Sequence, residues 1–598
     1  MFSKVLVANR GEIAVRIIRA LDDLGVASVA VYSELDRDGL HVARADEAYL
    51  LGPGPAAESY LLVDKIIEVA KQSGAEAVHP GYGFLAENAR FARACEEAEI
   101  AFIGPPASAI EAMGSKTAAR KLMEKASVPI VPGTTEPVAS VEDAQKVIED
   151  TVGYPVAVKA AGGGGGKGFR VAQTEEELEK AFEGAAREGE KFFGDATVYL
   201  ERYLPDPRHV EVQVLADGKG KVVHLGERDC SVQRRHQKLV EESPAPAVDE
   251  ELRARIGKIA TDAAEAVGYR GAGTIEGLLQ DEEYFFLEMN TRVQVEHCVT
   301  EEVTGIDIVA EGIRIAAGEA LSFAQEDVEL RGHAIECRVN AEDASKNFAP
   351  APGCIGRYRE PAGPGVRVDS GVGPGSEISP MYDPMVAKLI VWGRDREHAT
   401  ARMLRALGEY EISDLKTLIP FHIALMASDQ WAAGETCRDL VEDKEWLAQL
   451  SFPEPDANAD DEDEDEDAEK VEQDYTVEVS GRRFEVKVIG PPGAAAVAGG
   501  TNGAAPAGAK PKPRRSERAG GGRDGGGGPD ALISPIQGTV LKVAVEEGAS
   551  VDQGALIAVV EAMKMENEIS AHKAGEVAEL PISVGSSVAT GDTLAVIK

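Results

Sequence analysis

Residues 273–297 read GTIEGLLQDEEYFFLEMNTRVQVEH, and this stretch decides how the middle of the chain folds. Two apolar runs flank an acidic turn at residues 281–283, a pattern typical of a β-hairpin. If the turn is centred on Glu282, then Glu276 and Glu288 each lie six residues away from it. Residues placed in this way face each other on one side of a sheet.

The second run carries polar residues at every other position. If it stays extended, one set of side chains shares the side of Glu276: Glu288, Asn290, Arg292, Gln294 and Glu296. The alternate set is expected in the core: Leu287, Met289, Val293 and Val295. Facing carboxylates destabilise a sheet unless a cation lies between them, and carboxylate and amide oxygens suit Mg²⁺ bound to nucleotide phosphates. A solvated face would carry small polar residues and lysine instead, so the row predicts a metal site.

A glycine tract precedes this hairpin in the chain. Residues 156–168 read VAVKAAGGGGGKG, a strand that ends near Lys159 and runs into five glycines. Such a tract lets backbone N–H groups cradle phosphate. It is not a P-loop, because Gly168 follows Lys167 where Ser or Thr would hold the metal. A plain linker is the alternative, but the strand that ends in lysine favours a mobile lid over phosphates.

The two ends of the chain differ in composition from this middle part. Residues 1 to about 106 alternate between strand and helix patterns, which predicts a doubly wound α/β unit, and the first turn lacks GxGxxG. Residues 453–473 are acidic, and 491–529 are rich in Gly, Ala and Pro, as in a flexible linker with an r.m.s. reach of roughly 35 Å. An alternating piece at 475–488 predicts one hairpin between them.

The last stretch, 532–598, is dense in Val and Ile and punctuated by glycines, which predicts a small all-β domain. Its two halves resemble each other, and the sequence EAMKME at 561–566 lies at their junction. The simplest interpretation of Lys564 is that it is an ordinary surface lysine. The methionines on both sides of it, within a two-fold repeat, argue against that interpretation. With them, the segment resembles the biotinyl (biotin carboxyl carrier) domain. The resemblance implies that Lys564 is amide-linked to biotin.

Residues 1 to about 450 resemble the ATP-grasp superfamily and, within it, biotin carboxylase, through the hairpin, the glycine tract and the spacing of the charged residues between them. The resemblance implies ATP contacts from a set of polar and glycine residues: Lys116, Lys159, Gly164, Gly165, Gly166, His209, Gln233 and His236. It places Glu201 and Leu204 beside the adenine. Mg²⁺ (or Mn²⁺) would be held by Glu276, Glu288 and Asn290. Bicarbonate would be bound by Lys238, Arg292 and Val295, with Glu296 as its base, and Arg338 would face the ureido oxygen of biotin.

The fold class implied is α/β and α+β, in five segments along the chain. They are a doubly wound biotin carboxylase N-terminal domain at 1–113, an ATP-grasp domain at 114–331 with its lid at about 131–204, a C-terminal α+β domain at 332–450, a linker with a short hairpin at 451–529, and an all-β biotinyl domain at 530–598. One departure is Lys167-Gly168-Phe169, where the family loop usually reads Arg-Gly-Met. Lysine keeps the charge but loses the guanidinium fork.

The implied activity is the ATP-dependent carboxylation of biotin on Lys564 with bicarbonate. Only linker, hairpin and biotinyl domain follow Leu450, so a separate carboxyltransferase (β) subunit is expected to transfer the carboxyl group. The fusion of carboxylase and carrier resembles the α subunit of acyl-CoA carboxylases, which favours acetyl-CoA or propionyl-CoA as the acceptor over pyruvate. Biotin protein ligase is an expected partner, as is a second copy of the chain, paired through the carboxylase part within a larger hetero-oligomer. Two alternatives remain. The chain could be another ATP-grasp ligase, but the biotinyl domain argues against that. It could be a non-catalytic carrier, but the row of Glu, Asn, Arg and Glu residues argues against that.

The formal charge of −40 is spread well beyond the acidic run at 460–467. Such self-repulsion is relieved by salt, which favours adaptation to a salt-rich cytoplasm, as in a halophile, over an ordinary acidic protein. Nucleic acid is excluded as a partner by this charge. The sequence holds no apolar run near the roughly 20 residues that span a bilayer, no signal-peptide pattern and no paired cysteine spacing. A cytoplasmic protein without membrane contact is therefore expected.

Overall fold

The structure is a computed structural model of the chain. It describes residues 1–450 except 115, 161–167, 194–195 and 236, the strands 471–479 and 482–490, and residues 531–598 except 535–537, 546, 563–564, 584–585 and 589–591. None of the helices in these described ranges combines the length and the apolar character that crossing a bilayer demands.

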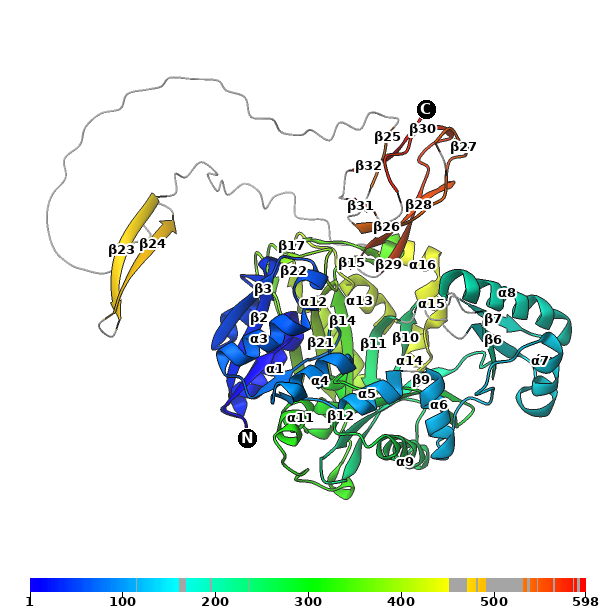
Figure 1. Cartoon of the computed structure of the whole chain (residues 1–598), viewed down its shortest axis with the longest axis horizontal. Coiled ribbons are helices and arrows are strands. Elements are labelled where there is room, and N and C mark those ends of the chain that lie inside the picture. Colours follow the sequence, from blue (N-terminus) through cyan, green and yellow to red (C-terminus); the bar gives the residue numbers. More distant parts are fainter. Residues whose placement is uncertain are drawn as a thin grey trace. The chain divides into compact units, whose positions relative to one another are not determined.

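The N-terminal segment is built on a parallel sheet. Its five strands are ordered β3 (Glu47–Gly52), β2 (Ala27–Ser33), β1 (Lys4–Val7), β4 (Ala77–His79) and β5 (Ala101–Phe102). Val5 and Val7 of β1 share a core with Ile17 of α1 (Gly11–Asp23). Leu6, which lies between them in the strand, shares a second core with Ile66 of α3 (Val63–Ser73). Because alternate side chains of β1 enter two cores, helices cover both faces of the sheet, and the unit is doubly wound as predicted (Figure 1).

A larger antiparallel sheet carries the middle of the chain. Its eight strands are ordered β13 (Glu283–Asn290), β12 (Gly271–Gln280), β9 (Arg208–Ala216), β10 (Val222–Arg234), β11 (Gln237–Ser243), β14 (His333–Asn340), β21 (Met385–Gly393) and β19 (Val366–Ser370). Since β11 pairs with β14, the sheet continues without a break across residue 332, where the sequence predicts a domain boundary.

The two faces of this sheet differ in chemistry. On one face, Cys337 and Leu389 pack against Met403 of α12 (Arg396–Glu409) and Phe421 of α13 (Ile419–Met426). Farther along the sheet, the valines of β9 pack against α9 (Glu250–Ala266). The side chains between these apolar positions point to the opposite face, where α10 (His297–Thr304) packs. The strands therefore gather their polar residues on one side.

Three smaller parts complete the fold. The segment predicted to be a lid contains a sheet ordered β7 (Phe169–Ala172), β6 (Val156–Ala160) and β8 (Val198–Arg202), which shares a core with α7 (Val141–Val147) and α8 (Glu175–Phe193). β23 (Val471–Val479) pairs with β24 (Arg482–Gly490) in a hairpin within a separate unit. The last part is all-β, with one sheet ordered β25 (Ala531–Ile533), β32 (Thr593–Ile597), β30 (Gly575–Glu579) and β27 (Ser550–Val551), and another ordered β29 (Met565–Ser570), β28 (Leu556–Ala562), β26 (Gly538–Val543) and β31 (Ser587–Val588).

Candidate active site

The hairpin of β12 and β13 places Glu276 opposite Glu288, as predicted, but by an unexpected route. The turn contains only Asp281 and Glu282, both with positive φ, and Gln280 pairs with Glu283. That register alone would offset Glu276 from Glu288 by one residue. A bulge between the pairs Glu276–Glu288 and Gly277–Phe286 adds the residue that brings the two glutamates into register.

The extended continuation to residue 296 is wrong. β13 ends at Asn290, and residues 291–296 form a loop that leads into α10. Glu87 of the N-terminal segment holds the start of this loop: its carboxylate accepts hydrogen bonds from the Thr291 backbone N–H (3.1 Å) and from Arg292 Nε (3.0 Å). Of the side chains expected in the core, Met289 and Val293 are buried, whereas Leu287 and Val295 are only half-buried.

Glu276 contacts side chains of three strands and of the loop before α10. Its Oε1 accepts hydrogen bonds from Lys238 Nζ (2.9 Å), Asn290 Nδ2 (2.7 Å) and Gln294 Nε2 (2.6 Å). Its Oε2 lies 2.9 Å from Nε2 of His209. Burial alone would raise the pKa of Glu276, but Lys238 and His209 outweigh it and hold that pKa far below its usual range. Glu276 is therefore a carboxylate.

Lys238 on β11 joins three carboxylates. Its Nζ donates to Oε2 of Glu211 (2.5 Å), to Glu276, and to Oε1 of Glu296 (2.7 Å). Burial would lower the pKa of Lys238, but Glu211 and Glu296 raise it well above its usual value, so the side chain stays an ammonium. A cation fixed among acids is positioned to stabilise negative charge that develops beside it.

Arg338 on β14 contacts Glu296 from the other side. Its Nη2 lies 3.0 Å from Oε2 of Glu296, and its Nε donates to Oε1 of Glu241 (2.6 Å). Burial would raise the pKa of Glu296, but Lys238 and Arg338 hold it well below its usual value. Glu296 is thus an ionised carboxylate between two cations, the state in which it can accept a proton.

The sequence did not single out Arg228, which organises the floor of the site. This fully buried guanidinium on β10 donates to residues of two strands, the loop and α10: Glu211, Gln213, Thr274, Gln294 and Thr300. One signal of this floor was present in the sequence. In β9, which begins at Arg208, His209, Glu211 and Gln213 alternate with valines. Polar residues at every other position of a buried strand indicate a polar network.

Lys159 and Glu201 lie together on the neighbouring lid strands β6 and β8. Nζ of Lys159 contacts Oε2 of Glu201, whose Oε1 also lies 3.0 Å from Nη1 of Arg120. Leu204 follows β8 and is half-buried, and Gln233 donates from Nε2 to the Cys230 carbonyl oxygen at 2.7 Å. In the described part of the chain, the hydrogen bonds and ion pairs given above do not join these four residues to Glu276 or Glu296.

Several predicted site residues fall outside what the structure describes. Lys116 lies in α6 (Lys116–Lys125), and its side chain is not described. The remaining ones, Gly164, Gly165, Gly166, His236 and Lys564, lie outside the described residues. Ala562 pairs with Met565 at the end of β28, so Met563 and Lys564 fall between two paired residues.

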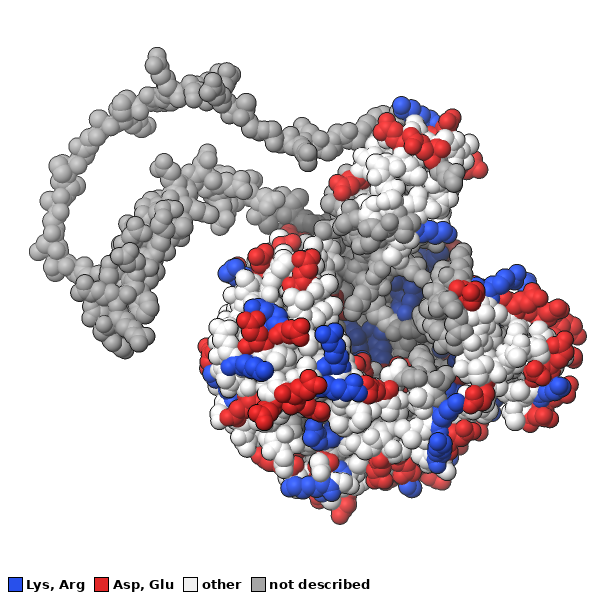
Figure 2. Space-filling view, in the orientation of Figure 1, with Lys and Arg blue, Asp and Glu red and all other residues white. Residues whose placement is uncertain are grey.

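The donors in the cluster fit a divalent cation that carries nucleotide phosphate. Glu276 and Glu288 are cross-strand carboxylates, and Asn290 adds an amide oxygen, the hard donors that Mg²⁺ prefers. Arg292 Nη2 donates to that oxygen at 3.0 Å, so anion-binding and metal-binding groups meet there. Although the chain is strongly acidic, Lys and Arg side chains show on the floor of the hollow in the middle of Figure 2. A cationic hollow beside oxygen donors suits an anionic substrate bound with a metal.

Four family profiles match the chain. They are described as the N-terminal domain of biotin carboxylase (residues 1–110), the ATP-binding domain of the carbamoyl-phosphate synthase L chain (115–324), the biotin carboxylase C-terminal domain (336–443) and biotin-requiring enzymes (530–597). Together they cover both the carboxylase part and the carrier domain.

Individual relatives agree with these profiles. The biotin-dependent acyl-coenzyme A carboxylase alpha3 subunit of Mycobacterium leprae is 47% identical over 599 residues, which span 100% of this chain and 98% of that protein. A pyruvate carboxylase subunit of Methanothermobacter thermautotrophicus is 54% identical over 443 residues, 74% of this chain and 90% of that protein. A solved structure, the biotin carboxylase domain dimer of Hydrogenobacter thermophilus 2-oxoglutarate carboxylase with MgADP, ADP and bicarbonate, has 49% identity and a TM-score of 0.70 over 76% of this chain and 100% of that one.

Proposed function

Because the chain belongs to the biotin carboxylase family and carries a biotin carrier domain, we propose that it is the subunit of an acyl-CoA carboxylase that carboxylates biotin on its own Lys564. Its cofactors are biotin, ATP and Mg²⁺. One observation carries the proposal: Glu296 lies between Lys238 and Arg338, and Lys238 also binds the oxygen donor Glu276, which accepts a hydrogen bond from Asn290. A base, an anion site and a metal site thus share one buried cluster.

We assign the metal to Glu276, Glu288 and Asn290. Mg²⁺ bound there would neutralise the charge of the ATP phosphates. Lys116, Lys159, His209 and the glycine loop would bind the nucleotide, and Glu201 and Leu204 would lie beside its adenine. A closing lid would exclude water from a reactive acyl phosphate.

Bicarbonate would be bound by Lys238, Arg292 and Val295. A carboxylate held by two cations is a weak base, but bicarbonate is itself an anion and competes with Glu296 for Lys238. Glu296 would then take the bicarbonate proton, and the freed oxygen would attack the γ-phosphate, giving carboxyphosphate and releasing ADP. Lys238 would stabilise the charge on the transferring phosphoryl group. Carboxyphosphate would break down to CO₂ and phosphate, and the phosphate would take the ureido N–H proton. The ureido nitrogen of biotin would accept the CO₂ while Arg338 binds the ureido oxygen.

The acceptor is proposed to be acetyl-CoA or propionyl-CoA. The relative named as an acyl-coenzyme A carboxylase subunit matches the carboxylase part, the linker region and the carrier domain together. Pyruvate is the second candidate, because the carboxylase part is 54% identical to a pyruvate carboxylase subunit, over 74% of this chain. The transfer step would belong to a separate carboxyltransferase subunit, and biotin protein ligase would attach the biotin. Pairing of two copies through the carboxylase part would match the dimer named for the Hydrogenobacter thermophilus domain.

The test follows labelled bicarbonate. The biotinylated chain, given ATP, Mg²⁺ and labelled bicarbonate with each acceptor in turn, should carry the label itself and pass it to an acyl-CoA only after the carboxyltransferase is added. Lys564→Arg keeps the charge and should lose both the label and the avidin signal. Lys542→Arg, an exposed lysine of the same domain, is the matched control and should keep both. Malonyl-CoA or methylmalonyl-CoA made by this chain alone would refute the division of labour, and avidin binding by Lys564→Arg would refute the attachment site.

A further inference from the structure

Lys388, on β21, is a fully buried ammonium beneath the loop that carries Glu296. Its Nζ donates to the Val295 carbonyl oxygen at 2.8 Å and to Cys298 Sγ at 3.1 Å. These two contacts lie on either side of Glu296 in the sequence. A lysine of the C-terminal segment therefore fixes the backbone of the turn from which the Glu296 side chain extends.

Buried acids surround this ammonium on the remaining sides. Oε2 of Glu12, from α1, lies 3.5 Å from Nζ of Lys388, and Oδ2 of Asp369, from β19, lies 3.8 Å away. Burial would lower the pKa of Lys388, but the acidic groups near it, Cys298, Glu12, Glu336 and Asp369, raise it above its usual value. Lys388 is therefore charged and its ammonium hydrogens are available to the Val295 carbonyl.

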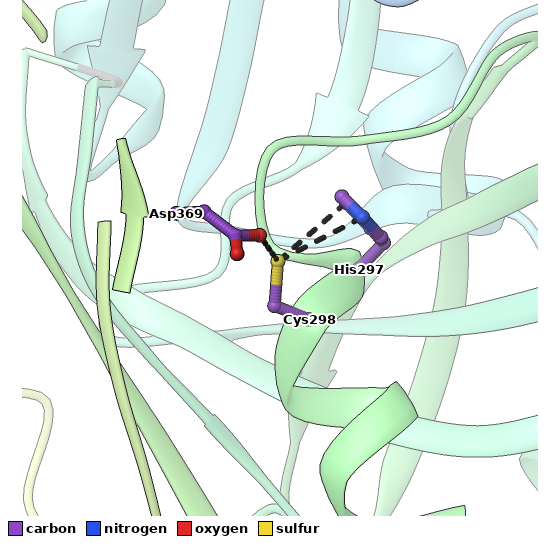
Figure 3. Close-up of side chains that lie close together, drawn as sticks. All are labelled: His297, Cys298 and Asp369. Carbon is purple, nitrogen blue, oxygen red and sulfur yellow. Dashed lines mark hydrogen bonds between the residues drawn. The ribbon is translucent and has the colours of Figure 1, made fainter. Parts of the chain in front are cut away.

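The same neighbourhood has the side chains of a metal site but is occupied by cations of the protein. His297, Cys298 and Asp369 lie close together, with Sγ of Cys298 between the other two (Figure 3). Arg367 Nη2 donates to Asp369 Oδ2 at 2.8 Å, and Lys388 donates to Cys298. Two cations in direct contact with the candidate ligands oppose a divalent ion. The acids of this cluster thus serve to hold Lys388 and Arg367.

The position of Lys388 in the sheet links it to the other side of Glu296. Lys388 pairs with Arg338 across β21 and β14, and Arg338 lies 3.0 Å from the Glu296 carboxylate. Neighbouring strands thus contact Glu296 twice, at its backbone turn through Lys388 and at its side chain through Arg338. Because both strands belong to one rigid sheet, the two contacts fix the carboxylate relative to Lys238 on β11 of the same sheet.

We propose that Lys388 is a positioning residue for bicarbonate activation: by holding the Val295 carbonyl, it sets the direction of the Glu296 carboxylate without touching any substrate. The inference rests on the proposed role of Glu296 as the base for bicarbonate. Misplacement of a reacting group by about 1 Å costs up to about 100-fold in rate. The loss should fall on the bicarbonate step, because Lys388 contacts none of the residues assigned to the nucleotide among those described.

The experiment compares Lys388→Met with Lys258→Met in the full biotinylated chain. Lys258 is an exposed lysine of α9, ion-paired at the surface to Asp262. Lys388→Met should raise the KM for bicarbonate at least about 10-fold and lower kcat, with the KM for ATP within about twofold of wild type. Lys258→Met should change neither.

Other results would overturn the inference. Equal rises in both KM values would show a general loosening of the fold. If Glu296→Gln loses turnover while Lys388→Met keeps its bicarbonate KM, the inference fails and the proposed function stands. If Glu296→Gln keeps turnover, both fail. Should Lys388→Met not fold, Lys388→Met/Glu12→Gln removes a buried carboxylate together with the ammonium, and the same comparison of KM values decides.

Discussion

At the scale of single residues, the site contains buried carboxyl groups whose pKa is raised by burial more than it is lowered by nearby cations. Glu241 is fully buried, and burial raises its pKa to about 7 even though Arg338 lowers it. Glu336 faces it across β11 and β14, is also fully buried, and neither of its oxygens has a hydrogen-bond partner within the described part of the chain. Burial raises the pKa of Glu336 well above its usual value. Glu336 therefore keeps its proton to a higher pH than an ordinary glutamate does, and its neighbour Glu241 shares one cation, Arg338, with Glu296.

This arrangement makes a prediction about stability and pH. The folded chain binds the Glu336 proton more tightly than the unfolded chain does, so Glu336 lowers the free energy of unfolding as pH rises above the unfolded pKa. Glu336→Gln removes this loss. The free energy of unfolding of the variant should therefore rise relative to that of the wild type between pH 5 and pH 8, by on the order of 1 kcal/mol at the upper end. Thermal unfolding across that range measures the difference.

The control is Glu377→Gln, an exposed glutamate of the same C-terminal segment, which accounts for the loss of one carboxylate from an acidic chain. A difference between Glu336→Gln and wild type that stays constant from pH 5 to pH 8 would mean that Glu336 is ionised in the folded protein.

At the scale of elements, the hairpin of β12 and β13 shows how far the sequence could be interpreted. The pairing of Glu276 with Glu288 was predicted correctly, but from a turn centred on Glu282, and the actual register reaches the same pair only through a bulge. The two-residue turn and the bulge that compensates for it were not predicted, since either register satisfies the same apolar pattern. The end of β13 at Asn290 could not be predicted either, because Glu87 holds the next residues and lies 204 positions earlier in the chain.

The Lys388 contacts were missed for the same reason. A single lysine in the apolar strand MVAKLIVWG carries no periodic signal, and its partners come from α1, β19 and the loop before α10. By contrast, the polar alternation of β9 was visible in the sequence and could have led to the Arg228 network. Patterns within one element can be found from the sequence alone, whereas contacts among distant elements require the fold.

The hairpin makes its own prediction. Glu288→Gln should reduce bicarbonate-dependent ATP cleavage about 100-fold or more, because a neutral amide cannot replace a carboxylate ligand of the metal. Glu283→Gln, at the exposed start of the same strand, is the matched control and should keep wild-type turnover. Steady-state release of ADP, measured at several Mg²⁺ concentrations, distinguishes weakened metal binding from a lost fold. Near-normal turnover of Glu288→Gln would show that the facing carboxylates do not hold the metal.

At the scale of the whole molecule, charge dominates. The formal net charge is −40, and the folded parts carry most of it. Repulsion among surface carboxylates opposes compactness at low ionic strength, and dissolved salt screens it. The acidic surface visible in Figure 2 is therefore expected to cost the folded state stability in dilute buffer.

The prediction is a melting temperature that rises with KCl. Because the screening length falls from about 30 Å at 0.01 M to about 3 Å at 1 M, most of the rise should occur below about 0.5 M. Differential scanning calorimetry over this range tests it. A steady rise that continues in proportion to concentration into the molar range would indicate exclusion of the salt from the protein surface instead. A melting temperature that is independent of KCl would contradict the role assigned to the acidic composition.

The way Glu87 and Lys388 hold the loop from two sides has a consequence for the protein while it is being made. Glu87 emerges from the ribosome well before residues 291–296, so the anchor for Arg292 is in place when that loop appears. Lys388 emerges later, after the hairpin and α10 are already outside. A nascent chain of intermediate length would therefore have the hairpin of β12 and β13 but not the contact from Lys388 to the Val295 carbonyl oxygen. The turn that carries Glu296 is held from both sides only after β21 has joined the sheet, so the order of synthesis makes this contact one of the last that the site acquires.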